Sequence, residues 1–219
     1  MHITYKEIKQ NERINQYIRK ADESLIALGF TEHSFPHVTR VAEHARRILL
    51  EFGYSSQEAE LARIAGYLHD IGNVVNRIDH AQSGALMAFR LLDTMGADTE
   101  DISTIVTAIG NHDEGTAFPV NPIAAALIIA DKTDVRSSRV RNKDIATFDI
   151  HDRVNYAVKH SHLHISQKHG IDLELTLDTG CCSLMDYFEI FLQRMVLCRK
   201  AAEKLNTAFG LIINEQRLL

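Results

Sequence analysis

The sequence has little of several residue types, and each shortage argues against a class of protein. It contains no Trp, three Pro and only three Cys among its 219 residues. Cys181 and Cys182 are adjacent and no Cys-x-x-Cys pair occurs, which argues against a thiol redox motif or a cysteine-held zinc ion. The longest strongly apolar run, Ile123 to Ala130, is far shorter than the roughly 20 residues that span a bilayer. We therefore expect no membrane partner.

Excess charge of one sign is also missing. Lys and Arg number 24 against 29 Asp and Glu, a net charge of −5, so the composition argues against binding of extended nucleic acid. The first ten residues, MHITYKEIKQ, are polar and lack the apolar segment of a secretory signal. With 45% hydrophobic and 24% charged residues, we expect a globular protein that works in the cytoplasm.

From the N-terminus to about residue 141 the apolar residues follow the 3.6-residue period of helices, and the breaks carry start and stop signals. From residue 34 onward the pattern delimits five helices with apolar faces. Their predicted starts are Ser34, the capping box Ser55–Glu58, Asp79 with Gln82 three residues on, a position near Asp98, and Asn121. The sequence therefore predicts a mostly α protein, with a helical bundle over residues 1–145.

Residues 146–219 differ in pattern and predict a small α+β appendage packed on the bundle. Its expected elements are a short helix, two alternating segments forming an antiparallel hairpin, a long amphipathic helix and a short strand, at 149–158, 160–166 with 171–177, 184–205 and 211–213. The apolar stripe of the long helix packs in the core or forms a homodimer seam.

Histidine, in contrast, is abundant, with twelve residues. Four of them lie at ends or on apolar faces of the predicted helices, namely His37, His69, His80 and His112. Asp131 continues an apolar stripe, where an unpaired carboxylate would be strongly destabilising, so a cation should lie beside it. A divalent metal is the simplest cation. Imidazole and carboxylate ligands without thiolate suit Fe, Mn, Ni, Co or Zn, with Mg at a more oxygen-rich position.

The order His37, then His69-Asp70, then Asp131 on successive helices resembles the metal-binding signature of the HD-domain phosphohydrolases. The resemblance covers about residues 30–141 and includes LHDIG at a helix end. It implies an HD-type helical bundle and a metal-dependent phosphohydrolase activity.

Two further histidines extend this resemblance. His80 in DHAQSGA and His112 in GNHDEG are similar to bacterial HD hydrolases that hold two iron ions and cleave diadenosine tetraphosphate. That pattern implies two ions, iron being favoured, with ligand sets His37, His69, Asp70 and Asp131 for one and His80, His112 and a bridging Asp70 for the other. The alternative is that His80 and His112 cap helices or lie in the core of an enzyme with one metal.

Basic residues near these ligands are candidates for phosphate contact, because Arg binds phosphate in bidentate fashion and Lys as a point charge. They are Arg40, Lys132, Arg136 and Arg139. A solvated connector is the alternative interpretation for the last three. Asp70 and Asp113 are the candidate catalytic residues. Asp113 and Asn111 flank His112 and are expected to orient either the attacking water or the proton of a ligand histidine.

The predicted substrate is a small phosphorylated molecule such as a nucleotide. Asp113 replaces a second histidine, and GTAFP replaces the Gly-Tyr-Pro motif, of the HD phosphodiesterases that cleave cyclic dinucleotides. Two alternatives stay open, an HD-type di-iron oxygenase and a non-catalytic ligand-binding module with a structural metal. His160, His162 and His164 alternate along a predicted strand and form either another metal site or a polar exposed face.

Overall fold

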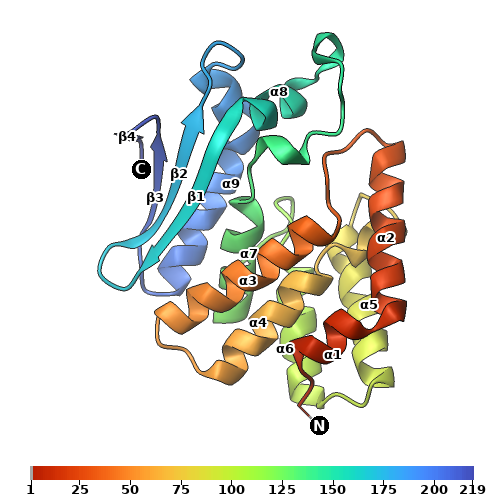
Figure 1. Ribbon diagram of the computed structural model, residues 1–219. Helices are drawn as coiled ribbons and strands as arrows, with labels where there is room; N and C mark the ends of the chain where they lie inside the picture. The colour runs from red at the N-terminus through yellow and green to blue at the C-terminus, as the bar shows by residue number, and fades with distance from the viewer. Residues whose placement is uncertain (1) are drawn as a thin grey trace.

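The structure, a computed structural model, describes residues 2–219. Its first part is helical, as predicted, and its C-terminal part adds a small sheet with a long helix (Figure 1). The helical part contains α1 (Tyr5–Gln10), α2 (Glu12–Ala27), α3 (Phe35–Glu51), α4 (Ser56–Leu68), the 3₁₀ turn η1 (Ile71–Val74), α5 (His80–Thr94), α6 (Thr99–Gly110) and α7 (Pro122–Lys132). The turns η2 (Ser137–Arg139) and η3 (Ile145–Thr147) lead to the C-terminal part.

The predicted helix starts agree with the structure, although the capping differs. Ser55 and Glu58 form the expected capping box of α4. Asp79 precedes α5 in a left-handed conformation, with φ 58°, and its side chain makes no capping bond. The Gln82 side chain instead donates to Thr116, so the cap expected at the start of α5 is absent.

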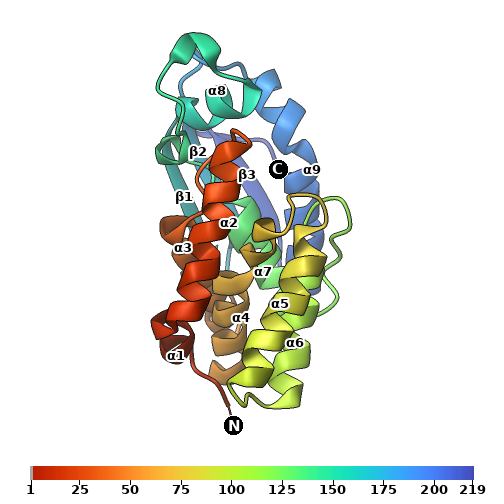
Figure 2. The same cartoon turned by 90° about the vertical axis from the view of Figure 1, so that its right-hand side faces the viewer.

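Two helices precede those that the sequence delimits. The Thr4 and Glu7 side chains form a capping box at the start of α1, and the Asn11 side chain caps α2. The α2 helix buries Ile14 and Ile18 and runs alongside the bundle (Figure 2).

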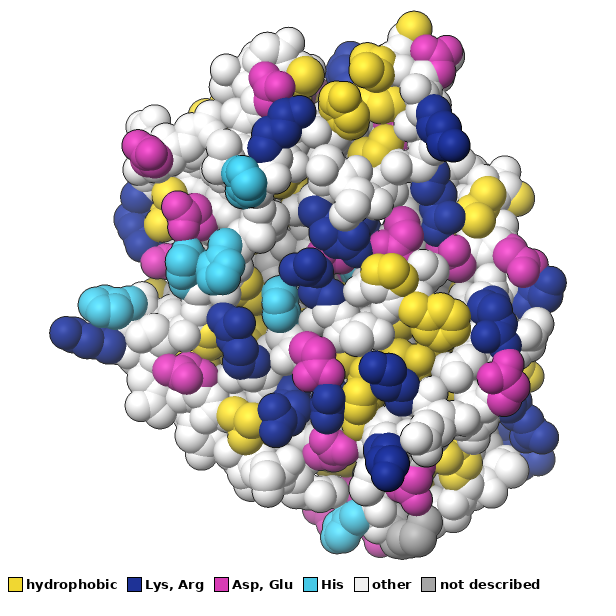
Figure 3. Space-filling view, viewed as in Figure 1, with side chains coloured by type: hydrophobic (Ala, Val, Ile, Leu, Met, Phe, Trp, Pro, Cys, Tyr) yellow, Lys and Arg dark blue, Asp and Glu magenta, His cyan; other side chains and the backbone are white. Residues whose placement is uncertain are grey.

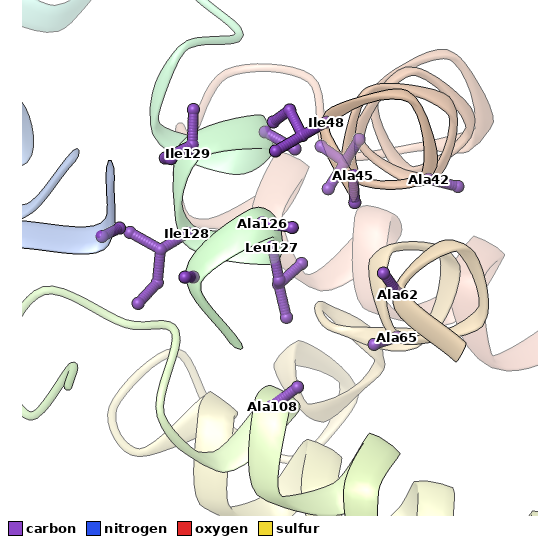
Figure 4. Close-up of a cluster of buried hydrophobic side chains, with 14 of the residues drawn as sticks. Ala42, Ala45, Ile48, Ala62, Ala65, Ala108, Ala126, Leu127, Ile128 and Ile129 are labelled. Atoms are coloured by element: carbon purple, nitrogen blue, oxygen red, sulfur yellow. The ribbon is translucent and has the colours of Figure 1, made fainter. Parts of the chain in front are cut away.

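Small residues allow the helices of the bundle to pack closely. Figure 4 shows alanines from α3, α4, α6 and α7 converging around Leu127. A Cβ added at Gly66 would lie 2.8 Å from the Cα of Ala42, so α4 approaches the backbone of α3 at this point. The ends of α3, α4 and α7 are thereby held close together, which positions the candidate site described below.

The C-terminal part contains α8 (Ile150–Ala157), β1 (Val158–Ser166), β2 (Gly170–Leu177), α9 (Leu184–Lys204), β3 (Phe209–Ile213) and β4 (Gln216–Arg217). The sheet order is β1-β2-β3-β4, with β1 antiparallel to β2 as predicted. The β3 strand pairs parallel to β2, and β4 was not predicted. Because α9 packs on both α7 and β3, one hydrophobic core spans the bundle and the sheet.

The histidines of β1 lie on the exposed face of the sheet, where histidine side chains gather over this strand in Figure 3. The rings of His162 and His164 are 4.3 Å apart, and His164 Nε2 lies 2.6 Å from a carboxylate oxygen of Glu174 on β2. Within residues 2–219, His160, His162 and His164 do not form a group close enough to hold a metal. The polar-face interpretation of this strand therefore agrees with the structure.

Helices that could cross a bilayer are absent from residues 2–219, since none is both long and apolar enough.

Candidate metal centre

Five helix ends converge on one point. His37 lies in the first turn of α3, His69 and Asp70 directly follow α4, and His80 begins α5. His112 follows the end of α6, and Asp131 lies in the last turn of α7. The structure brings all six residues together in three overlapping groups, whose ligand atoms lie within 4.8 Å of one another, namely His37-His69-Asp70, His69-His112-Asp131 and Asp70-His80-His112.

The four histidines direct the same ring nitrogen, Nε2, toward this point. Each Nδ1 lies within 3.0 Å of a fixed oxygen, the partners being Asp134 Oδ2 for His37, Gly66 O for His69, Arg77 O for His80 and Ile109 O for His112. A carbonyl oxygen only accepts hydrogen bonds, so Nδ1 must carry the proton in the last three. In the neutral ring Nε2 then has a free lone pair, as a metal ligand requires.

Four buried polar atoms of the site have no hydrogen-bond partner, namely His37 Nε2, His69 Nε2, His112 Nε2 and Asp70 Oδ2. The shortest separations between these rings and the carboxylates, such as 3.4 Å from His37 Nε2 to Asp131 Oδ1, are longer than hydrogen bonds. Leaving buried polar atoms unpaired is destabilising. The donor set therefore fits divalent metal ions, with imidazole nitrogens and carboxylate oxygens directed toward one another.

The two ligand carboxylates are held by neighbours on their own segments. Asn73 Nδ2 donates to Asp70 Oδ1 at 2.9 Å, which leaves Oδ2 directed toward the histidines. Lys132 Nζ lies 2.8 Å from Asp131 Oδ2 and 3.5 Å from Glu114 Oε1. Asn73 and Glu114 were not singled out in the sequence.

Burial and charge keep Asp131 and His112 in states that bind metals. Burial alone would raise the pKa of Asp131, but the Lys132 cation holds it well below its usual value. Burial, reinforced by the nearby His69, holds the pKa of His112 well below its usual value, so its ring is neutral near pH 7. Burial lowers the pKa of Lys132, but Asp131 and Glu114 more than compensate and raise it. Lys132 therefore remains a cation.

Asp134 is a further residue that the sequence did not single out. It is buried, and its Oδ2 accepts a hydrogen bond from His37 Nδ1 at 2.8 Å. Three arginines surround it, with Arg136 Nε 2.9 Å and Arg40 Nε 3.4 Å from Oδ1, and Arg139 Nη1 3.7 Å from Oδ2. Burial would raise its pKa, but the His37 hydrogen bond and these arginines lower it strongly. Asp134 is therefore an anion that orients His37.

A cavity of about 180 Å³ opens beside the ligands. Asp70, His80 and Asp131 line it together with cationic side chains from four segments, which are Arg77, Lys132, Arg139 and Arg194. The centre thus borders a cavity that carries cationic side chains close to the metal ligands.

The predicted phosphate-binding residues divide into two pairs. Lys132 and Arg139 line the cavity. Arg40 and Arg136 are instead engaged with Asp134, and Arg136 also pairs with Glu32 at 2.9 Å. The Arg40–Asp134 and Arg136–Glu32 contacts join residues distant in sequence, which accounts for this arrangement.

Asp113 lies at the edge of the site. Its Oδ1 is 3.8 Å from His80 Nε2 and 3.9 Å from Lys132 Nζ.

The cavity is also lined by three residues that lack a sequence pattern of their own, namely Arg77, Arg194 and His33. The C-terminal part is therefore not separate from the site, since Arg194 belongs to α9.

Gly72 explains the close approach of two of the ligand-bearing segments. A Cβ at this position would collide with the carbonyl oxygen of His80 and lie 2.5 Å from the backbone nitrogen of Gly84. Only glycine lets the segment after Asp70 contact the first turn of α5, and this contact brings His80 to the centre.

Fold and site together define a helical protein with a buried His/Asp cluster suited to divalent metals. The chain belongs to the HD domain family, whose model matches residues 35–190. It is 23% identical over 159 residues to the uncharacterised protein MJ1020 of Methanocaldococcus jannaschii, covering 63% of this chain. The chain spans 61% of the length of that relative.

A solved structure is also similar. A predicted HD superfamily hydrolase from an uncultured Thermotogales bacterium has 30% sequence identity and a TM-score of 0.44, over 57% of this chain and 68% of that one.

Proposed function

We propose that the protein is a metal-dependent phosphohydrolase with two metal ions, which cleaves a phosphoester or phosphoanhydride bond of a nucleotide or similar small molecule. One observation carries the proposal. Three overlapping groups of mostly buried ligands, with four unpartnered polar atoms, border a cavity to which four cationic side chains contribute. HD family membership is consistent with this activity.

The ligand groups suggest how two ions would be shared. Asp70 belongs to the first and third groups and presents both carboxylate oxygens, Oδ2 toward His37 and His69 and Oδ1 toward His80. Bound divalent ions at such a site supply Lewis-acid activation of water and of the phosphoryl group. Asp70 is therefore proposed as the bridging ligand, and iron or manganese as the ion.

The cations of the cavity are proposed to bind the phosphoryl group. Lys132 is buried and its Nζ contacts Asp131. Its ammonium group is therefore already held beside the ligands and need not move when the substrate binds. Arg77 Nη1 lies 3.4 Å from His80 Nε2, and no carboxylate among residues 2–219 pairs with its guanidinium. Arg77 can therefore neutralise charge that develops on the phosphoryl oxygens, whereas Arg139 and Arg194 are partly committed to Asp134 and Glu114.

Asp113 is proposed to orient the attacking water. Its Oδ1 lies near His80 Nε2 and Lys132 Nζ, and a carboxylate oxygen accepts hydrogen bonds from water. Holding a water in line with the scissile bond contributes to the rate through positioning.

The cationic lining favours phosphate chemistry over the two alternatives. An oxygenase centre or a purely structural metal would not require four cationic side chains from separate segments around its cavity. The proposal therefore treats Arg77 and Lys132 as part of the active site.

A phosphate-release screen tests the proposal. Protein loaded with Mn²⁺ or Fe²⁺ is offered nucleoside monophosphates, dinucleoside polyphosphates and p-nitrophenyl phosphate, with His69→Ala and Asp70→Ala as controls. We expect phosphate release by the wild type, lost in both variants. Release from none of these substrates, or oxygen consumption without phosphate release, would contradict the proposal.

A further inference from the structure

One wall of the cavity comes from α8 and the residue that caps it, in the C-terminal part of the chain. Asp149, His151, Asp152 and Asn155 of this segment line the same cavity as Asp70 and Lys132. Figure 1 shows α8 at the end of the molecule where α2, α3 and α7 converge. The C-terminal part therefore contributes to the site from two helices, α8 and α9.

Two carboxylates lie on the α8 wall, whereas Arg77 and Lys132 lie beside the metal ligands. On the side of the ligands, Arg77 has no carboxylate partner among residues 2–219, and the buried Lys132 places its Nζ 2.8 Å from Asp131 Oδ2. On the α8 side, Asp149 and Asp152 make no ion pair in the described part of the chain. Asp149 Oδ1 accepts a hydrogen bond from the backbone nitrogen of Asp152 at 2.8 Å, so the carboxylates are neighbours. A ligand that fits both walls is anionic at one end and donates hydrogen bonds at the other.

Hydroxyl groups suit the α8 wall better than a second anion does. Carboxylates only accept hydrogen bonds, whereas the amide of Asn155 and the imidazole of His151 can both donate and accept. A hydroxyl group also does both, so adjacent hydroxyls can satisfy such a mixed wall. Further phosphate groups placed against Asp149 and Asp152 would be repelled.

The size of the cavity limits what it encloses. Its volume of about 180 Å³ is below the roughly 300–1,000 Å³ of pockets that enclose drug-sized ligands. A phosphoryl group with a few hydroxylated carbons is of this scale, and a second nucleotide is not. Larger substituents would project past Leu28 and Phe30, which are 61% and 39% exposed at the mouth.

We propose that residues 149–155 form the wall that selects the substrate, and that the enclosed part of the substrate is a sugar monophosphate, either free or within a nucleoside 5′-monophosphate. This rests on the proposed phosphohydrolase function. Hydrolysis forms a bond from the water oxygen to phosphorus and breaks the bond from phosphorus to the sugar oxygen. One proton passes from water to that sugar oxygen, giving the free alcohol and inorganic phosphate.

A matched pair of variants isolates the role of the wall. Asp149 and Asp144 are both exposed and both cap short helical segments, α8 and η3, through a side-chain oxygen. Asn caps as well as Asp, so Asp149→Asn and Asp144→Asn each remove one negative charge without loss of the cap. Only Asp149 lines the cavity.

Steady-state kinetics of the Mn²⁺-loaded protein provide the test, with ribose 5-phosphate, AMP, phosphoethanolamine and p-nitrophenyl phosphate as substrates. We expect Asp149→Asn to raise KM for ribose 5-phosphate about tenfold relative to p-nitrophenyl phosphate, which lacks hydroxyl donors, because a hydrogen bond to a charged acceptor is lost. Asp144→Asn should leave this ratio unchanged. A lower KM for AMP than for ribose 5-phosphate would identify a nucleotide as the source of the sugar phosphate, and equal values would identify the free sugar phosphate.

Two results would overturn the inference while the proposed function stands. One is the same KM ratio in both variants and the wild type. The other is a preference for phosphoethanolamine that Asp149→Asn abolishes, since the wall would then bind an ammonium group. If the wild type releases phosphate from none of the four esters, the proposed function fails and this inference fails with it.

Discussion

Asp134 makes a sharp prediction because it contacts the candidate ligand His37 but belongs to none of the candidate ligand groups. Replacing it with alanine removes the acceptor that fixes the His37 ring through Nδ1 at 2.8 Å. Partners of this kind typically change metal affinity by about 10–100-fold, which corresponds to about 1.4–2.7 kcal/mol. Asp134→Asn keeps an oxygen that can accept from Nδ1 and should therefore lose less affinity.

Co²⁺ titration measures this effect directly, because the absorption of the bound ion reports occupancy without turnover. Removing a buried carboxylate also destabilises the fold, so a control is needed. Asp101 is the match, since it is 4% exposed like Asp134 and lies 2.8 Å from the Nδ1 of His2. Asp101→Ala should lower stability and leave Co²⁺ affinity unchanged. Wild-type affinity in folded Asp134→Ala protein would refute the reasoning.

Three other predictions concern stability, each measured by urea unfolding. Gly72→Ala forces a Cβ into the backbone of His80 and should lower the free energy of unfolding by about 1–3 kcal/mol or more. Gly115→Ala is the control, because the space around Gly115 is open, and it should leave the free energy of unfolding nearly unchanged. Equal losses in the two variants would contradict the packing argument. Burial, with Arg40 and Arg47, lowers the pKa of His44 to about 4, so the unfolded state binds more protons as the pH falls from about 6.5. His44 should then lower the free energy of unfolding by about 2 kcal/mol between pH 7 and pH 5. The His44→Gln variant should lack this part of the pH dependence of stability. The same pH dependence in the variant and the wild type would refute the assignment. Ser55→Ala removes the capping box of α4 and should cost about 1 kcal/mol, and an unchanged midpoint would contradict this.

The sequence predicts those features whose cause is local. The capping box at Ser55 and the Gly170 turn, with φ 88°, are specified by neighbouring residues, and both appear in the structure. Asp131 could be singled out because a carboxylate on an apolar stripe needs a cation, and the structure places it among the other candidate ligands. The parallel pairing of β3 with β2 could not be predicted, because the α9 helix separates them in the chain.

The rest of the site depends on contacts between distant residues. Arg136 follows Asp131 closely and looks like a phosphate ligand, but its partner Glu32 lies 104 positions earlier. Arg194 lies on the long helix whose apolar stripe the sequence assigns to the core or to a homodimer seam. It reaches the cavity because α9 packs on α7. Asp134 lies just beyond α7, outside any periodic pattern, so its contact with His37 becomes visible only in three dimensions.

The central claim is that the six converging His and Asp residues form a centre for two divalent metal ions. Metal content per chain, measured by mass spectrometry on protein purified without chelator, tests it most directly. We expect about two ions in the wild type, one in His80→Ala, which removes a ligand of the third group only, and none in Asp70→Ala, whose carboxylate belongs to two groups. A wild-type protein that stays free of metal after incubation with Fe²⁺ or Mn²⁺, or an Asp70→Ala variant that retains both ions, would contradict it.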